Sequence, residues 1–285
     1  ADYIMMISMD AKYDGSPGLV WGSATPPVLP PTGHLVLTEL TPEGWVTELI
    51  ESNTVSQNAQ SFLKFDRYDN PHVVYAKATG GLHYAVRENG AWTFSEITSE
   101  TAHGFTLDVT FSGKPVVSYM DLNSNLYYAE PSGTGSWNRA SLYTNSSPGC
   151  LAMIQVDHND RPDIMYMDSV AGHAVHFVNS DTGWDHIDLI EIPYGYGSQC
   201  DYCISSAGKH YVAWFNMTAN EFQLATADPG SESWTVSTID DRMISPVYIS
   251  INLDPLERIN VTYYEAVYDR IFNAVLREDI WYDIG

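Results

Sequence analysis

The sequence is poor in positive charge. Its 285 residues include 13 lysines and arginines against 36 aspartates and glutamates, a formal net charge of −23. Such a surface repels nucleic-acid phosphates and anionic lipid headgroups, so we expect neither nucleic acid nor the membrane as a partner. Solubility in an extracellular or salty medium explains the acidity, and recruitment of cations is the alternative.

Long apolar runs are also missing, and none is long enough to span a bilayer. Hydrophobic residues still make up 44% of the chain, which is ample for a folded core. The chain starts at Ala1 without Met and carries no signal-like segment, as a mature secreted protein does after cleavage and as a shortened chain does too. We therefore expect an extracellular or cell-surface location.

Cysteine is scarce, with only Cys150, Cys200 and Cys203. Cys200 and Cys203 form a C-x-x-C, but residues three apart on a strand point to opposite faces, and no second pair completes a tetrahedral metal site. Cys150 and Cys200 fall near the starts of neighbouring repeats, where a structural disulfide is geometrically possible. Buried thiols are the main alternative, and metal or redox chemistry is a third.

Tryptophan, in contrast, recurs at a fixed interval. Six of the eight tryptophans are separated by 47, 45, 47, 50 and 47 residues, which is an internal repeat. They are Trp45, Trp92, Trp137, Trp184, Trp234 and Trp281. About thirty residues upstream of most copies lies an aromatic residue, followed two positions later by a usually polar one. These pairs are Trp21/Ser23, Tyr75/Lys77, Tyr119/Asp121, Tyr166/Asp168, Trp214/Asn216 and Tyr263/Glu265.

One copy of the repeat predicts four strands. They are Ser61–Asp66, His72–Ala76, Leu82–Arg87 and Trp92–Ile97, with turn residues between them. A radially repeated unit of this kind is a propeller blade. We predict an all-β fold: a six-bladed β-propeller of four-stranded antiparallel blades of about 47 residues each, in one domain over 1–285. The predicted blades are about 1–51, 57–99, 102–145, 148–191, 197–240 and 244–285. No blade is shared between the termini, so blade one closes the ring by packing on blade six.

The predicted ligand face is the one that carries the loops from second to third strands and the linkers between blades. The aromatic-x-polar row lies there, and aromatic rings beside carboxylates and amides suit sugars. The alternative is structural: the aromatics pack between blades, and Asp121, Asp168 and Asn216 cap turns. The candidate ligand-binding residues on this face are Trp21, Tyr119, Asp121, Tyr166, Asp168, Tyr194, Tyr196, Trp214 and Arg270.

Two linker segments and three sequons add further candidates. In residues 192–197, Tyr194 and Tyr196 alternate with glycines, and we expect this segment to be a contact loop or a cover over the channel mouth. The proline-rich arm 24–33 docks on a neighbouring subunit or braces the closing blade. The candidate glycosylation sites are Asn145, Asn216 and Asn260.

The blade repeat resembles those of secreted bacterial and archaeal propellers, a group that includes sialidase-type folds and six-bladed fungal fucose lectins. The sialidase Asp box survives only as the degenerate Ser180–Trp184, and few arginines fall on the predicted ligand face, which disfavours a sialidase. The Arg-Glu-Trp sites that the lectins imply between blades are not evident. Residues 157–163 resemble integrin-type calcium loops but are two residues shorter, so we expect no cofactor, with calcium as a minor alternative.

Motifs of common hydrolases, metalloproteases and nucleotide-binding enzymes are absent. The sequence thus favours a secreted, non-catalytic binding or assembly module, whose partner is a glycan or a surface protein. A glycan-active enzyme is one alternative, because Asp121, Asp168, Asp241 and Glu265 offer a carboxylate pair. A surface subunit that self-associates through the 24–33 arm is the other.

Overall fold

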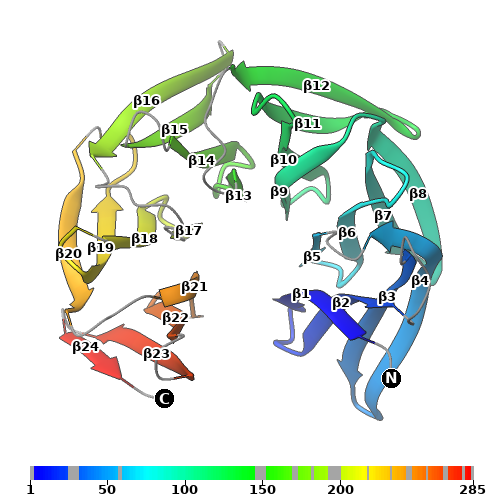
Figure 1. Cartoon of the computed structure of the whole chain (residues 1–285), viewed down its shortest axis with the longest axis horizontal. Helices are drawn as coiled ribbons and strands as arrows, with labels where there is room; N and C mark the ends of the chain where they lie inside the picture. Colours follow the sequence, from blue (N-terminus) through cyan, green and yellow to red (C-terminus); the bar gives the residue numbers. More distant parts are fainter. Residues whose placement is uncertain are drawn as a thin grey trace. The chain divides into compact units, whose positions relative to one another are not determined.

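The structure is a computed structural model. It describes residues 3–24, 32–56, 60–144, 152–168, 173–180, 183–191, 200–216, 218–231, 233–241, 246–254, 256–265, 269–277 and 280–283. These residues form β-strands and turns, and the strands pair into six antiparallel sheets of four (Figure 1). The chain divides into two compact units, residues 1–145 and 146–285, each holding three sheets.

The first unit contains blades 1 to 3, each built from four consecutive strands. Blade 1 comprises β1 (Tyr3–Ala11), β2 (Pro17–Ala24), β3 (Thr32–Thr41) and β4 (Gly44–Ser56). Blade 2 comprises β5 (Ser61–Phe65), β6 (Pro71–Ala76), β7 (Leu82–Glu88) and β8 (Ala91–Thr98). Blade 3 comprises β9 (Ala102–Val109), β10 (Pro115–Asp121), β11 (Leu126–Gly133) and β12 (Ser136–Tyr143).

The second unit contains blades 4 to 6 with the same strand order. Blade 4 comprises β13 (Met153–Val156), β14 (Pro162–Asp168), β15 (His173–Ser180) and β16 (Gly183–Glu191). Blade 5 comprises β17 (Cys200–Ile204), β18 (His210–Asn216), β19 (Glu221–Ala227) and β20 (Thr235–Asp240). Blade 6 comprises β21 (Pro246–Leu253), β22 (Ile259–Glu265), β23 (Arg270–Arg277) and β24 (Ile280–Asp283).

The predicted fold class, an all-β six-bladed propeller, is confirmed. The four strands expected in blade 2 are present to within about one residue at each end. No sheet mixes strands from the two ends of the chain, so no blade is shared between the termini. The closure of blade one on blade six stays a prediction.

The turn from first to second strand has the same five-residue form in all six blades. In blade 2 the amide of Asp66 donates to the carbonyl of Asn70, and that of Asp69 to the carbonyl of Asp66. The fourth residue has a left-handed backbone conformation each time. This conformation is strained for residues with a Cβ and is freely adopted by glycine. Its φ is 84° at Gly15, 63° at Asp69, 87° at Gly113, 63° at Asp160, 79° at Gly208 and 61° at Glu257.

Side chains at the first turn position reinforce this geometry. Oδ1 of Asp66 accepts the amides of Tyr68 and Asn70, each at 2.8 Å. Asp157 accepts the amides of Asn159 and Arg161 at 2.8 and 2.9 Å. The segment that resembles a calcium loop therefore has the same capped turn as blade 2, and the expectation of no cofactor, with calcium as the minor alternative, stays a prediction.

The hydrophobic core lies between consecutive blades within each unit. One cluster joins Leu37 of blade 1 to Leu63 of blade 2, and another joins Leu82 of blade 2 to Phe105 of blade 3. In the second unit, equivalent clusters lie between blades 4 and 5 and between blades 5 and 6. Cys200 packs in the first of these and Cys203 in the second, so the two sulfur-bearing side chains lie on opposite faces of β17, as expected.

Within each unit, the first strands of consecutive blades lie next to one another. Side chains of one first strand accept hydrogen bonds from backbone amides at the edge of the other. Oγ of Ser8 on β1 accepts the amide of Leu63 on β5 at 3.1 Å. At the equivalent place in the second unit, Oδ2 of Asp201 on β17 accepts the amide of Ile251 on β21 at 2.9 Å. A polar residue on one blade thus covers an unpaired strand edge on the next.

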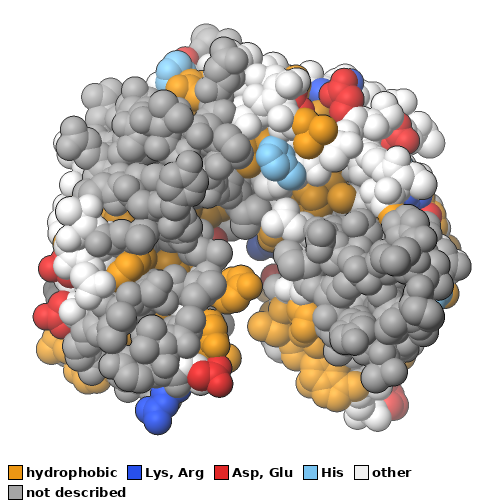
Figure 2. Space-filling model, viewed as in Figure 1, with side chains coloured by type: hydrophobic (Ala, Val, Ile, Leu, Met, Phe, Trp, Pro, Cys, Tyr) orange, Lys and Arg blue, Asp and Glu red, His pale blue; other side chains and the backbone are white. Residues whose placement is uncertain are grey.

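Blades 1 and 6 each carry exposed hydrophobic side chains, visible as orange atoms in Figure 2. On blade 1 these include Ile7 and Met9, and on blade 6 Tyr248 and Ile271 border an apolar hollow of about 450 Å³. The described part of the chain includes no helix long and apolar enough to cross a membrane.

The left-handed turn position can be tested with Gly113→Ala. A Cβ at Gly113 meets nothing closer than 3.7 Å, so the cost comes from its φ of 87°. We expect the free energy of unfolding to fall by about 1–2 kcal/mol in urea titrations. Gly133→Ala is the matched control, because a Cβ there meets open space and its φ is not positive. Equal stability of the two variants would contradict the assignment.

Candidate functional site

Within each unit, grooves lie between neighbouring blades at the end where first strands turn into second strands, one between blades 2 and 3 and one between blades 5 and 6. The repeat tryptophans Trp137 and Trp281 line these grooves, and Trp92 and Trp137 bond to the preceding blade. Nε1 of Trp92 donates to Oε1 of Glu48 at 3.0 Å, and Nε1 of Trp137 donates to Oγ of Ser95 at 2.9 Å. Each acceptor lies three residues after the tryptophan of the preceding blade.

Between blades 1 and 2, ion pairs fill this position. The Arg87 guanidinium contacts Glu48 at 2.5 Å and Glu39 at 2.7 Å, and Lys12 contacts Glu39 at 2.9 Å. Burial opposes the charge on Arg87, but its hydrogen bonds to Glu39 and Glu48 outweigh burial and raise the pKa of Arg87. These charges neutralise one another, which leaves no unpaired group to hold a ligand.

Between blades 2 and 3 the groove is small, with a volume of about 340 Å³. His72, Tyr84 and Trp137 line it, and Nδ1 of His72 lies 2.5 Å from the Tyr84 hydroxyl. Burial lowers the pKa of His72, although the Asp66 carboxylate 3.6 Å away partly opposes the shift. The imidazole is therefore held in its neutral form inside the fold.

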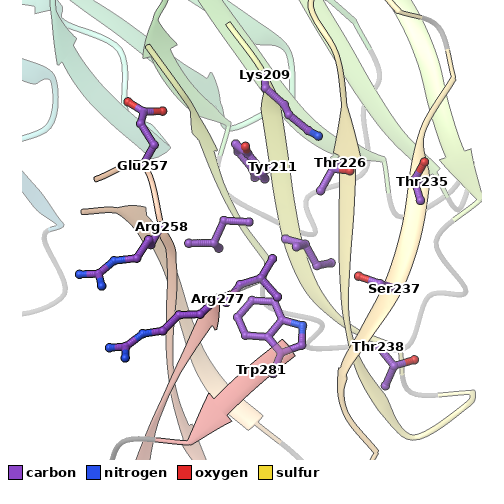
Figure 3. Close-up of a pocket in the computed structure, with 13 residues that line it drawn as sticks. Lys209, Tyr211, Thr226, Thr235, Ser237, Thr238, Glu257, Arg258, Arg277 and Trp281 are labelled. Atoms are coloured by element: carbon purple, nitrogen blue, oxygen red, sulfur yellow. The ribbon is translucent and has the colours of Figure 1, made fainter. Parts of the chain in front are cut away.

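The groove between blades 5 and 6 has a volume of about 760 Å³, more than twice that of the groove between blades 2 and 3 (Figure 3). Trp281 lies between a basic side contributed by blade 6 and a row of hydroxyls contributed by blade 5. Ser237, the counterpart of Glu48 and Ser95, borders the same space. The lining residues are Lys209, Tyr211, Leu224, Thr226, Thr235, Ser237, Thr238, Glu257, Arg258, Ile259, Leu276, Arg277 and Trp281.

The electrostatics of this groove leave one arginine available. Arg258 is held by Asp254 at 2.5 Å, and Lys209 lies 3.6 Å from Asp228. Arg277 has no carboxylate within ion-pair distance among the residues that the structure describes, and its guanidinium lies 6.0 Å from the Tyr282 ring. The groove thus combines an aromatic surface, hydroxyl groups and a guanidinium that no described carboxylate pairs with.

Several described residues of the predicted ligand face are buried or hydrogen-bonded within turns. The rings of Tyr119, Tyr166 and Trp214 are at most 1% exposed, so they offer no stacking surface in this structure. Asp121 accepts the amides of Asn123 and Asn125 at 2.8 and 2.9 Å. Burial alone would raise the pKa of Asp121, but the hydrogen bonds from its turn hold it below the usual value. This geometry agrees with the packing and capping interpretation of the aromatic-x-polar row.

The remaining candidates are spread over several elements. Trp21 donates from Nε1 to Thr38 at 3.0 Å, and Arg270 is exposed at the start of β23. Nδ2 of Asn216 donates to Gln223 and that of Asn260 to the Arg258 carbonyl, each at 3.0 Å. Outside the described residues lie Tyr194, Tyr196, Asn145, Cys150, most of the 24–33 arm and the side chain of Asp168, so the disulfide and these sites stay predictions.

Sequence reasoning expected few arginines on the predicted ligand face and did not select Arg258 or Arg277 as candidates. The structure places them at the turn before β22 and at the end of β23, and both line the groove beside Trp281. The available signal was the tryptophan interval itself, because the repeat tryptophans Trp137 and Trp281 each line such a groove.

Comparisons with known proteins reveal the fold and little more. No family model matches the chain, and no curated protein matches it by sequence. Solved structures do match. The SapL1 lectin in complex with alpha methyl fucoside is 12% identical, with a TM-score of 0.67, over 98% of this chain and 94% of that one.

Two further neighbours represent a lectin and an enzyme. The fucose-specific lectin from Aleuria aurantia is 13% identical, with a TM-score of 0.58, over 98% of this chain and 94% of that one. The intramolecular trans-sialidase from Ruminococcus gnavus is 10% identical, with a TM-score of 0.60, over 92% and 90%. At these identities the likeness establishes the propeller fold alone.

The buried His72 predicts a pH dependence of stability. Its pKa is lower in the fold than in the unfolded chain, so the unfolded chain takes up a proton first as the pH falls. The free energy of unfolding is therefore highest above the unfolded pKa and decreases from about pH 7.5 to 5. We expect His72→Gln to be less stable at pH 7.5 but to show a shallower pH dependence in urea titrations.

His83 and His210 also have pKa values lowered by burial, so part of the dependence remains in that variant. The control is His158→Gln, at an exposed position, which should retain the wild-type profile. An unchanged profile in His72→Gln would refute the assignment.

Proposed function

We propose that this protein is a carbohydrate-binding propeller that takes an acidic sugar in the groove between blades 5 and 6. The observation that carries the proposal is the joint presence, in one groove of about 760 Å³, of Trp281 and of Arg277, which has no carboxylate partner among the described residues. An indole supports the apolar face of a sugar ring, and a guanidinium binds a carboxylate or sulfate through two parallel hydrogen bonds.

The hydroxyl row supports the same ligand class. Thr235, Ser237 and Thr238 are exposed along one side of the groove, where they can exchange hydrogen bonds with sugar hydroxyls. A neutral sugar would leave Arg277 unpaired, whereas an acidic one neutralises it. Because the protein has a net charge of −23, an anionic ligand is repelled by most of its surface and attracted to this local positive charge.

An extracellular or cell-surface location accompanies this proposal, with a surface glycan, free or carried by a protein, as the partner. The fold supports a glycan partner, because neighbours of this architecture are named as lectins and as a trans-sialidase. Self-association through the 24–33 arm is a separate proposal, which light scattering on the intact and arm-deleted protein tests.

A glycan-active enzyme is the second candidate, because some neighbours are enzymes. Glu257 is the one carboxylate among the described residues that line the groove, and its oxygens lie 3.3 Å from the Ser206 amide. Canonical glycoside hydrolysis uses a pair of carboxyl groups. The groove therefore favours binding, and an enzyme would use carboxylates elsewhere, such as Asp168.

Glycan-array screening followed by calorimetry tests the proposal. We expect the protein to bind sugars that carry a carboxylate or sulfate, with affinity that falls as salt rises. Trp281→Ala and Arg277→Gln should each weaken binding by about tenfold or more, whereas Arg277→Lys retains part of it.

Trp45→Ala is the matched control, because Trp45 holds the same repeat position in blade 1 and is 55% exposed. Binding of neutral and acidic sugars alike, or binding that survives Arg277→Gln unchanged, would overturn the assignment. Product formation that Asp168→Asn abolishes would instead establish the enzyme.

A further inference from the structure

A cluster of polar side chains fills the groove between blades 4 and 5. Asp163 on β14 and His176 on β15 come from blade 4, and Tyr202 on β17 and His210 on β18 come from blade 5. Asp163 and His176 are each 5% exposed, and Tyr202 is 1% exposed. The ring of Trp234, the repeat tryptophan of blade 5, lies 6.1 Å from the His210 ring.

Comparison of corresponding strand positions shows that other blades have different residues where this cluster lies. Asp163 is the second residue of its second strand, and Tyr211 has that place in blade 5. His210 is the first residue of its second strand, where blades 2, 3 and 4 have proline. The corresponding residues in the groove between blades 5 and 6 are Tyr211, Leu224, Ile251 and Ile259. Two imidazoles and a carboxylate are therefore particular to one groove.

The polar atoms of the cluster lie close together. Nε2 of His176 is 2.5 Å from Oδ1 of Asp163, and the Tyr202 hydroxyl donates to the same Oδ1 at 2.7 Å. Nδ1 of His210 lies 2.6 Å from the Tyr202 hydroxyl. The ligating atoms of Asp163, His176 and His210 all lie within 4.8 Å of one another.

We propose that Asp163, His176 and His210 bind a divalent transition-metal ion, zinc foremost, which ties blade 4 to blade 5. Two imidazole nitrogens and a carboxylate oxygen form a donor set that zinc prefers, and the fourth position is open to water. The Tyr202 hydroxyl holds the carboxylate in place from outside the coordination sphere. The acidic surface raises the local concentration of cations around the site.

The observed spacing fits such an ion after a small adjustment. Bonds of about 2.0–2.2 Å in a tetrahedron place neighbouring ligand atoms roughly 3.3 Å apart. Nε2 of His176 and Oδ1 of Asp163 are 2.5 Å apart, and all three ligand atoms lie within 4.8 Å of one another, a range that includes that value. Zinc takes neutral imidazole and ionised carboxylate as ligands, so the ion replaces the hydrogen bond between His176 and Asp163.

Metal binding is tested on the full chain after treatment with EDTA. We expect calorimetry to detect one zinc ion per chain and zinc to raise the melting temperature. Cobalt(II) should give the intense visible absorption of a tetrahedral site. His176→Gln and His210→Gln should weaken zinc binding by about tenfold or more, and Tyr202→Phe by about tenfold.

The matched control is His186→Gln, an exposed histidine on β16 of the same blade, which should bind zinc as the wild type does. If a ligand variant fails to fold, X-ray absorption of the zinc-loaded wild type decides, because it should show imidazole nitrogen and oxygen but no sulfur. No zinc uptake by the wild type, equal affinity in His176→Gln, or sulfur ligation through the cysteines would overturn the proposal. Glycan binding in the presence of EDTA separates this site from the groove between blades 5 and 6.

Discussion

A blade of this protein has two apolar faces and covers neither of them itself. Side chains alternate along a strand, so each four-stranded sheet presents hydrophobic residues on both sides. Within each unit, the core clusters accordingly lie between blades rather than inside them. The second-strand aromatics, such as Tyr75 and Tyr119, are buried for this reason. Stability thus depends on neighbouring blades having complementary faces.

The four blade boundaries within the two units share one backbone geometry and differ in the side chains that line them. The same backbone holds ion pairs around Arg87, a neutral histidine at His72, a carboxylate with two imidazoles at Asp163, and an open space beside Trp281. The repeat tryptophan fixes one wall each time, so chemical differences arise from the few side chains that face it. A single architecture thereby provides sites of quite different polarity.

The sequence predicted what depends on local pattern. The tryptophan interval and the alternation of residues predicted six blades of four strands, and turn residues between the strands of blade 2 marked where they end. The aromatic-x-polar row was correctly placed on second strands. The position of the open groove was not predicted, because its volume depends on side chains from several strands of two blades, among them a serine at 237 where blade 1 has Glu48. The cluster at Asp163 and His210 escaped notice for a similar reason, since these residues lie far apart in the chain and meet only across a blade boundary.

The hydrogen bond from the repeat tryptophan to the preceding blade bears on how such a chain diversifies. Trp92 belongs to blade 2 but its acceptor Glu48 belongs to blade 1, and Trp137 likewise relies on Ser95. Where the sequence has Ile187 at the equivalent position, the indole N–H of Trp234 is buried without an acceptor among the described residues. A blade duplicated or exchanged by recombination would carry its donor and leave its acceptor behind. A duplicated segment keeps this hydrogen bond only if it contains both sides of a blade boundary, with the acceptor from one blade and the tryptophan from the next.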